Sequence, residues 1–94
     1  MKKRFPTHLH LSRKIKALAH PARIQLMERL MKEECCVTEA KKCLRLSQPN
    51  VSQHLKVLKQ AGIIAGRREK NRICYRIADE QIRKALIILL EGDN

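Results

Sequence analysis

The stretch LSQPNVSQHLKVLKQAG, from Leu46 to Gly62, has the features of one short helix with a defined start and end. Pro49 fits the first turn, where its missing N–H costs little, and Gly62 follows the last periodic residue, as a C-terminal glycine should. The apolar residues recur at helical spacing and predict a side that faces a core. These residues are Val51, Leu55 and Leu58, flanked by Val57 and Ala61.

The opposite side of this helix is rich in amide, hydroxyl and imidazole groups rather than the Glu/Lys mixture of an ordinary solvated helix. It carries Asn50, Ser52, Gln53, His54, Lys56, Lys59 and Gln60. Amides can bond adenine edges in the major groove, and hydroxyls and lysines can bond phosphates. Taken alone, the pattern fits a DNA-reading helix and a polar surface helix equally well. The rest of the chain must decide between them.

The composition points to a polyanionic partner. The chain has 94 residues, enough for one domain, and its net charge is +12, with 21 Lys and Arg against 9 Asp and Glu. Nucleic acid is the first candidate partner for so basic a domain, and an acidic membrane surface is the second. Phe5 and Tyr75 are the only aromatic residues, which argues against a stacking platform for single-stranded nucleic acid.

No export signal is visible, because polar and charged residues break up the segment after the basic start. The longest apolar run, Ala85 to Leu90, is far too short to span a bilayer. We therefore expect a cytoplasmic protein with no membrane partner. In that compartment four cysteines are expected to be thiols, ligands or sensors rather than structural disulfides.

Periodicity predicts three helices before the helix of residues 46–62. They cover residues 7–20, 21–32 and 38–44, with a tight turn at 45–47. Thr38 is expected to cap the third helix, and His20 to cap or pack at the junction before Pro21. Residues 1–6 are expected to form a basic, frayed arm. Two short helices joined by a few residues, the second polar on its outer face, make a helix-turn-helix.

After Gly62 the apolar period changes to two, with Ile73, Tyr75 and Ile77 on one face. This predicts a β-hairpin with a charged tip at Lys70-Asn71, where Asn tolerates a positive φ. Basic residues cluster near the tip: Arg67, Arg68, Lys70 and Arg72. Beside a helix-turn-helix such a hairpin is expected to be a wing that grips phosphates. The alternative is an edge hairpin protected by its charges.

A last helix is predicted to begin at Ala78-Asp79-Glu80, where acidic residues suit the helix dipole. Apolar residues cover most of its circumference: Ile82, Ala85, Leu86, Ile87, Ile88, Leu89 and Leu90. A terminal helix of this kind in a small chain needs another surface to cover it, and self-association is the economical answer.

Three segments together resemble the ArsR/SmtB family of winged-helix repressors: KALAHPARIQLMERL at 16–30, SQPNVSQHLKVLKQAG at 47–62 and YRI at 75–77. The resemblance covers roughly residues 15–90. It implies a mainly α winged helix-turn-helix fold with a small β-hairpin, and from the chain length residues 1–94 are expected to form a single domain. It also implies a homodimer assembled through the first and last helices, which binds double-stranded operator DNA. The family's DNA-reading helix falls here on Ser47, Gln48, Asn50, Ser52, Gln53, His54 and Lys56.

The sensing sites of this family are matched only in part. Of the family's two cysteines around the third helix, the first matches Cys36, but Thr38 stands at the second. Cys35 is additional and Cys43 lies further along. The last helix has carboxylates at Asp79, Glu80, Glu91 and Asp93 but neither histidine nor cysteine. The family's usual zinc site and its redox pair in that helix are therefore expected to be absent.

Geometry limits what the thiols can do together. A bridge between the neighbours Cys35 and Cys36 would be strained, because their Cα atoms lie only about 3.8 Å apart. In one helix, Cys36 and Cys43 would be separated by about 10.5 Å of rise, too far to share an ion unless the chain folds back. Thiols beside a helix N-terminus are favoured as thiolates. Cys35, Cys36 and Cys43 are thus the candidates for a soft metal, metalloid or oxidant, whereas buried, inert thiols remain the alternative for Cys43 and Cys74.

The sequence accordingly predicts a homodimeric transcriptional repressor that a thiol-reactive signal releases from its operator. Two alternatives stay open: a constitutive DNA-binding regulator with structural cysteines, and a basic RNA-binding module. An enzyme is not expected, because the chain has no nucleophile–base motif, no glycine-rich phosphate loop and no complete catalytic metal motif.

Overall fold

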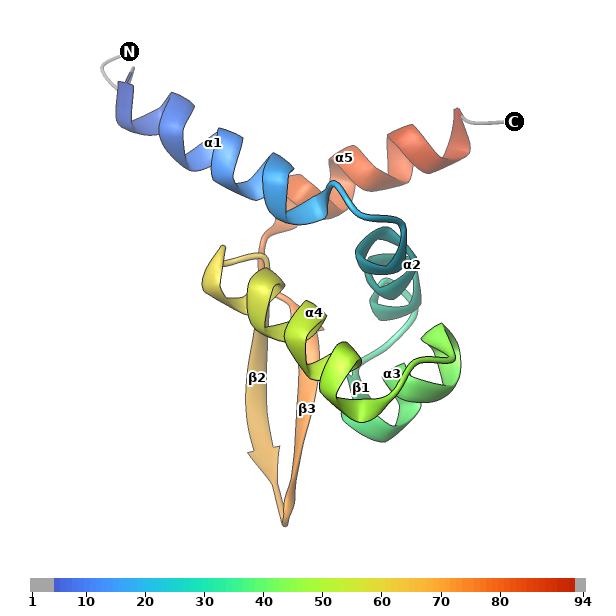
Figure 1. Cartoon of the computed structure of the whole chain (residues 1–94). Helices are drawn as coiled ribbons and strands as arrows, with labels where there is room; N and C mark the ends of the chain where they lie inside the picture. The colour runs from blue at the N-terminus through green and yellow to red at the C-terminus, as the bar shows by residue number, and fades with distance from the viewer. Residues whose placement is uncertain (1–4, 93–94) are drawn as a thin grey trace.

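The structure, a computed structural model, describes residues 5–92 and contains five helices and three short strands in that range. In chain order these are α1 (Phe5–Leu18), α2 (Pro21–Leu30), β1 (Cys35–Cys36), α3 (Val37–Leu44), α4 (Gln48–Gln60), β2 (Ile64–Glu69), β3 (Arg72–Ile77) and α5 (Glu80–Glu91). Figure 1 shows α1 and α5 at one end of the molecule and the tip of the β2–β3 hairpin at the other. The helix-turn-helix of α3 and α4 lies beside this hairpin, as a winged helix requires.

The core is formed by the apolar faces of the central helices and the start of the hairpin. Leu26 and Met27 of α2, Leu55 and Leu58 of α4, and Ile63 are fully buried. Because each helix presents one apolar stripe at helical spacing, these stripes meet in a single cluster. The predicted core side of the opening stretch is confirmed.

The end of α4 follows the predicted pattern. Gly62 has a φ of +79°, a left-handed conformation that glycine adopts without strain. Its N–H donates to the carbonyl of Lys59 at 3.0 Å, and the N–H of Ile63 donates to that of Leu58 at 3.0 Å. These two bonds form a Schellman motif, in which Ile63 and Leu58 are both buried. The chain is thereby turned sharply from α4 into β2.

The turn of the helix-turn-helix uses a non-glycine residue. Arg45, the C-cap of α3, has a φ of 56° and lies in the left-handed region. Its N–H donates to the carbonyl of Lys41 at 2.7 Å, which closes the helix before α4 begins. A non-glycine residue in this conformation costs about 1–2 kcal/mol, so the packing of α3 against α4 must hold it there.

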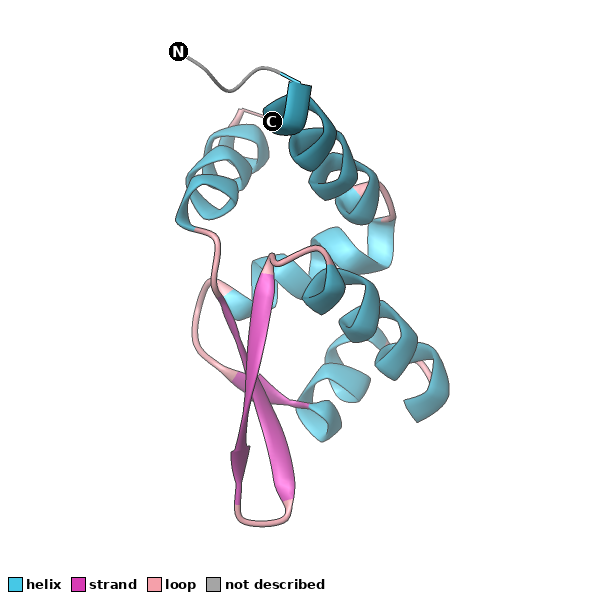
Figure 2. Ribbon diagram, turned by 90° about the vertical axis from the view of Figure 1, so that its left-hand side faces the viewer, coloured by secondary structure: helices cyan, strands magenta, loops and turns pink. Residues whose placement is uncertain are grey.

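The sheet has three strands rather than the two predicted. The strand order is β1-β3-β2 and both pairings are antiparallel (Figure 2). In β1, Cys35 lies opposite Tyr75 and Cys36 opposite Cys74. Local patterning predicts no strand at these two cysteines, because a strand of two residues is too short to show a period. The pairing with β3 is a long-range contact that no local pattern reveals.

Three smaller predictions need correction. Helix α1 begins at Phe5, so the expected frayed arm does not extend to residue 6, and residues 1–4 lie outside the described part of the chain. The N-cap of α3 is Cys36 rather than Thr38. At the hairpin tip the positive φ, 61°, belongs to Lys70 and not to Asn71.

Candidate nucleic-acid interface

Helix α4 presents most of its predicted DNA-reading residues to solvent. Six of the seven are exposed: Ser47, Gln48, Asn50, Ser52, Gln53 and Lys56. Ser47 is also the N-cap, and its Oγ accepts from the N–H of Asn50 at 3.5 Å. Because Val51, Leu55 and Leu58 fix the opposite side in the core, the exposed side has one orientation relative to the rest of the molecule.

His54, the seventh of these residues, points partly inward. Its Nδ1 accepts a hydrogen bond from Arg23 Nε at 3.1 Å, and its ring centroid lies 4.6 Å from that of His20. Burial, together with the charges of His20 and Arg23, lowers the pKa of His54. His20 itself caps α2, because its Nδ1 accepts from the N–H of Ala22 at 3.0 Å. The capping prediction for His20 is confirmed, and His54 is held by the same junction.

The four basic residues of the wing divide between the two faces of the sheet. Arg68 lies opposite Ile73 and faces α4, whereas Arg67 lies opposite Cys74 on the outer face. All four side chains are exposed, and Lys70 lies at the tip. The expected single basic cluster is therefore two groups, since neighbouring residues in a strand point to opposite faces.

The outer group is neutralised in part by acidic neighbours. Arg67 Nη2 lies 2.8 Å from Glu34 Oε1, and the same guanidinium lies 3.8 Å from Glu69. These carboxylates raise the pKa of Arg67. Arg72 Nη2 lies 3.9 Å from Glu69. In contrast, Arg68 has no ion pair of this kind within residues 5–92, so it is the wing arginine most available to a phosphate.

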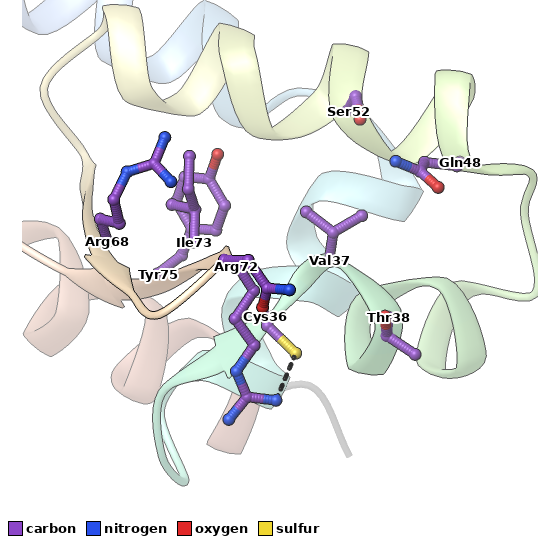
Figure 3. Close-up of a pocket in the computed structure, with 10 residues that line it drawn as sticks. Cys36, Val37, Thr38, Gln48, Ser52, Arg68, Arg72, Ile73 and Tyr75 are labelled. Atoms are coloured by element: carbon purple, nitrogen blue, oxygen red, sulfur yellow. Dashed lines mark hydrogen bonds between the residues drawn. The ribbon is translucent and has the colours of Figure 1, made fainter.

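A groove separates the wing from the N-terminal half of α4. Its volume is about 420 Å³, and Gln48 and Ser52 line it from α4 while Arg68 and Tyr75 line it from the wing. Figure 3 shows these side chains around the same space, with the sulfur of Cys36 turned away from Ser52 and Gln48 toward Arg72. Amide, hydroxyl and guanidinium groups thus converge on one concave surface, which is the combination that suits base edges and phosphates.

The sheet separates two of the thiols predicted to act together, Cys35 and Cys36, whereas Cys43 packs against the same core as Cys35. Cys35 is 1% exposed and belongs to the core, where burial raises its pKa to about 11. The expectation that Cys35 is favoured as a thiolate is therefore not met. Cys36 points to the other face of β1, and its Sγ accepts from Arg72 Nη1 at 3.6 Å. Cys43 lies near Gln25, whose Nε2 donates to the Cys43 carbonyl at 3.0 Å.

Cys74 is a residue whose neighbours could not be inferred from the sequence. It is 6% exposed, and its Sγ donates to Glu69 Oε1 at 3.2 Å. This hydrogen bond, followed by burial, raises the pKa of Cys74. The register places it directly beside Cys36. All four cysteines are free thiols in the structure.

The donor set does not fit a metal bound by three or more side chains. Within residues 5–92, no three His, Cys, Asp or Glu side chains are grouped closely enough to hold an ion. Cys35 and Cys36 point to opposite faces, and Asp79 is engaged as the N-cap of α5 and in an ion pair with Lys14 at 2.6 Å. Asp93, named among the carboxylates of the last helix, lies outside the described residues. In the same part of the chain no helix is long and apolar enough to cross a membrane.

Known regulators share both the sequence and the fold. The family model described as "Bacterial regulatory protein, arsR family" matches residues 20–65, which include the helix-turn-helix. The chain is 43% identical over 68 residues to the HTH-type transcriptional repressor SmtB of Mycobacterium tuberculosis. The match covers 72% of this chain and 50% of the repressor, so the chain spans about half the length of that relative.

Two solved structures extend the similarity to nearly the whole chain. The homodimeric winged helix-turn-helix DNA-binding domain Mb0332 of Mycobacterium bovis is 28% identical with a TM-score of 0.86, covering 98% of this chain and 86% of that one. The transcriptional repressor BigR of Xylella fastidiosa is 30% identical with a TM-score of 0.82, covering 89% and 86%. These relatives are regulators rather than enzymes. Because the family model matches residues 20–65, the fold is a winged helix-turn-helix and these relatives are similar in sequence and structure, the chain belongs to the ArsR family of bacterial regulatory proteins.

Proposed function

We propose that the protein is a homodimeric, cytoplasmic transcriptional repressor that binds double-stranded operator DNA and that a thiol-reactive signal releases it. The observation that carries the DNA-binding part is the exposed polar side of α4 beside the wing, on a chain with a net charge of +12. A rigid helix with amides and hydroxyls at its N-terminal half suits the major groove. Arg68 and Lys70 of the wing suit phosphates.

DNA binding is tested with duplexes selected from a random-sequence library, titrated with the protein at increasing salt. Because the protein neutralises phosphates with Lys and Arg, affinity should fall steeply as salt rises. The double variant Ser52→Ala, Gln53→Ala should lose specific binding, whereas Gln60→Ala at the far end of the same helix should not. Equal affinity of the wild type, the double variant and Gln60→Ala for the selected duplex would refute the assignment of α4. Tighter binding of single-stranded or duplex RNA would support the RNA-binding alternative.

The homodimer is supported by apolar surface at the end of the molecule opposite the wing tip. Leu11 and Ile15 of α1 are 49% and 56% exposed, and Ile88 and Leu89 of α5 are 69% and 65% exposed. An apolar groove of about 410 Å³ runs between these helices and α2. Large contiguous apolar surfaces are rarely left open to water. In a two-fold dimer, this arrangement would let two α4 helices reach successive major grooves about 34 Å apart.

Dimerisation is tested by sedimentation at increasing protein concentration. Ile88→Glu places a charge on the exposed apolar side of α5 and should give a monomer with greatly weakened DNA binding. The control Gln81→Glu adds the same charge at an exposed polar position of α5 and should remain a dimer. A monomeric wild type across the whole concentration range would contradict the proposed dimer.

The signal is proposed to be an oxidant rather than a chelated metal. Cys35 lies in the core and Cys36 on the outer face of the sheet. No group of three metal-binding side chains is present in residues 5–92. A thiol pair can nevertheless be oxidised without further ligands. Full release from the selected duplex by a soft metal ion under reducing conditions would favour the metal instead. If neither the oxidant nor the metal ion changed the affinity for DNA, although all thiols had reacted, the constitutive regulator would be favoured.

A further inference from the structure

Two of the four thiols lie side by side on the outer face of the sheet. Cys36 of β1 and Cys74 of β3 are directly opposed in the antiparallel register. Directly opposed residues point to the same face, and their Cα atoms lie about 4.5 or 5.5 Å apart, depending on the type of pair. Both values fall within the range of about 4.4–6.8 Å that a disulfide spans. The backbone therefore holds this pair at bridging distance.

No other pair of cysteines has this relation. Cys35 and Cys36 are neighbours in one strand and point to opposite faces. Cys35 lies in the hydrophobic core, opposite Tyr75, and Cys43 lies near Gln25 toward the end of α3. Cys36 and Cys74 are both buried but stand outside that core. Their burial has a different origin from that of Cys35.

Charged side chains, rather than core residues, cover the pair. Arg67 lies beside Cys74 in the register and is ion-paired with Glu34 at 2.8 Å. The side chains of Arg67 and Glu34 are 51% and 39% exposed, so this ion pair lies at the surface. Exposed ion pairs contribute only about 0–1 kcal/mol, so this cover opens easily. A small polar oxidant can therefore reach the sulfur atoms without unfolding the core.

The two sulfur atoms have different neighbours. Arg72 Nη1 donates to Cys36 Sγ at 3.6 Å, so this sulfur accepts a hydrogen bond from a guanidinium. Cys74 Sγ instead donates its proton to Glu69 Oε1 at 3.2 Å. This difference assigns Cys36 as the thiol that is oxidised first and Cys74 as the thiol that resolves it.

We propose that a hydroperoxide converts Cys36 and Cys74 into an intramolecular disulfide, and that this bridge lowers the affinity of the protein for DNA. In the first step the Cys36 thiolate attacks the peroxide, the O–O bond breaks, and Cys36 becomes a sulfenic acid as the leaving alkoxide or hydroxide is protonated. In the second step Cys74 gives its proton to Glu69 and attacks the Cys36 sulfur. The S–S bond forms and water leaves. Two thiols are oxidised by two electrons and one peroxide is reduced.

The bridge acts on both halves of the candidate interface. Cys36 is the N-cap of α3, and its N–H donates to Glu39 Oε1 at 2.9 Å. Drawing its sulfur toward Cys74 removes the acceptor of Arg72 and displaces the start of α3 relative to the wing. Because α3 supports α4, the spacing between α4 and the wing changes. The effect on DNA rests on the proposed function, whereas formation of the disulfide does not.

The chemical half is tested by treating the reduced full chain with hydrogen peroxide and mapping peptides without reduction. The wild type and Cys43→Ser should yield a Cys36–Cys74 linked peptide, and Cys36→Ser should yield none. In Cys74→Ser the sulfenic acid on Cys36 should persist and be trapped by dimedone. Both serine variants are expected to fold, because serine is a good N-cap and can still donate to Glu69. Disulfides confined to Cys35 or Cys43, or no disulfide at all, would overturn the proposal.

The regulatory half is tested on the selected duplex. Oxidised wild type should bind about tenfold more weakly, within the range typical of allosteric coupling, and a thiol reductant should restore binding. Cys74→Ser should keep its affinity after the same treatment. An equal loss of affinity in Cys74→Ser, or unchanged affinity of the bridged wild type, would refute the regulatory half. Failure of the reduced wild type to bind any duplex would refute the proposed function instead. Peptide mapping would still test whether the disulfide forms.

Discussion

Arg23 Nε donates a hydrogen bond to Nδ1 of His54 at 3.1 Å, which joins α2 directly to the middle of α4. The same guanidinium donates through Nη1 to the carbonyl of Ala17 at 3.1 Å, near the end of α1. Three helices thus meet at one arginine. The candidate DNA-reading helix is positioned by polar bonds as well as by its apolar stripe, and one of these bonds requires an unprotonated ring nitrogen.

Acidification is expected to loosen this junction. Burial, with the charges of His20 and Arg23, lowers the pKa of His54 below its ordinary value of 6.5. Protons therefore bind the unfolded chain more readily, and the free energy of unfolding should fall as pH drops through about 6.5 and below. His54→Asn keeps an acceptor for Arg23 but cannot be protonated. Its free energy of unfolding should therefore fall less on acidification than that of the wild type. Urea unfolding at a series of pH values between about 8 and 5 measures this, with the exposed His10→Asn as control. An unchanged pH dependence in His54→Asn would count against the role of this ring.

Asp79 is expected to stabilise the start of α5. Its Oδ1 accepts from the N–H of Ile82 at 3.1 Å, and its Oδ2 accepts from Lys14 Nζ at 2.6 Å. Asp79→Ala should lower the free energy of unfolding by about 1–2 kcal/mol, as expected for a lost N-cap. Asp79→Asn keeps the cap and should cost less. The neighbouring Glu80→Ala serves as the exposed control, and the three variants are compared by urea unfolding.

The same carboxylate gives a second, acidic pH dependence. Burial opposes ionisation of Asp79, but the hydrogen bonds from Lys14 and Ile82 outweigh it and lower the pKa of Asp79 below its ordinary value of 3.8. Its contribution is present above that value and is lost as pH falls through the lowered pKa. Asp79→Asn should therefore unfold less steeply with acid than the wild type. A parallel acid transition for the two proteins would show that Asp79 is not responsible.

Arg68 and Arg67 are expected to differ in their effect on DNA although they are neighbours. Arg68 faces the groove beside α4, whereas Arg67 is bound to Glu34 and Glu69 on the other face. Arg68→Ala should weaken binding to the selected duplex and reduce the slope of log affinity against log salt by about one. Arg67→Ala should change both much less. The opposite ranking would mean that the outer face of the wing meets the phosphates.

Gly66 is expected to resist substitution because Tyr75 lies over it. A Cβ at this position would meet Ile73 Cγ2 and Tyr75 Cε1 at 3.0 Å each. Gly66→Ala should therefore cost about 1–3 kcal/mol, as expected for overpacking. In Gly92→Ala the added Cβ meets the Ile88 carbonyl oxygen at 3.4 Å, and a change within about 0.5 kcal/mol is expected. Equal stability of both variants would show that the Tyr75 ring moves aside without cost.

The sequence by itself determined the elements whose signals are local. Pro49 and Gly62 marked α4, and its apolar stripe identified the buried side, because capping and helical periodicity depend only on residues a few positions apart. The alternation of Ile73, Tyr75 and Ile77 likewise identified the inner face of β3. The resemblance to one family rested on residues 16–30, 47–62 and 75–77, and the family match over residues 20–65 confirms it.

Only the tertiary structure decided which residues from different segments meet. His54 shares the polar side of α4 with Gln53, yet its ring is bonded to Arg23, 31 positions earlier. Arg67 and Arg68 are adjacent in sequence but face opposite sides of the sheet. Cys36 and Cys74 are paired by a strand of two residues that carries no periodic signal. Long-range strand pairing and side-chain packing depend on the whole chain. Local sequence patterns therefore could not reveal that Cys74 lies beside Cys36.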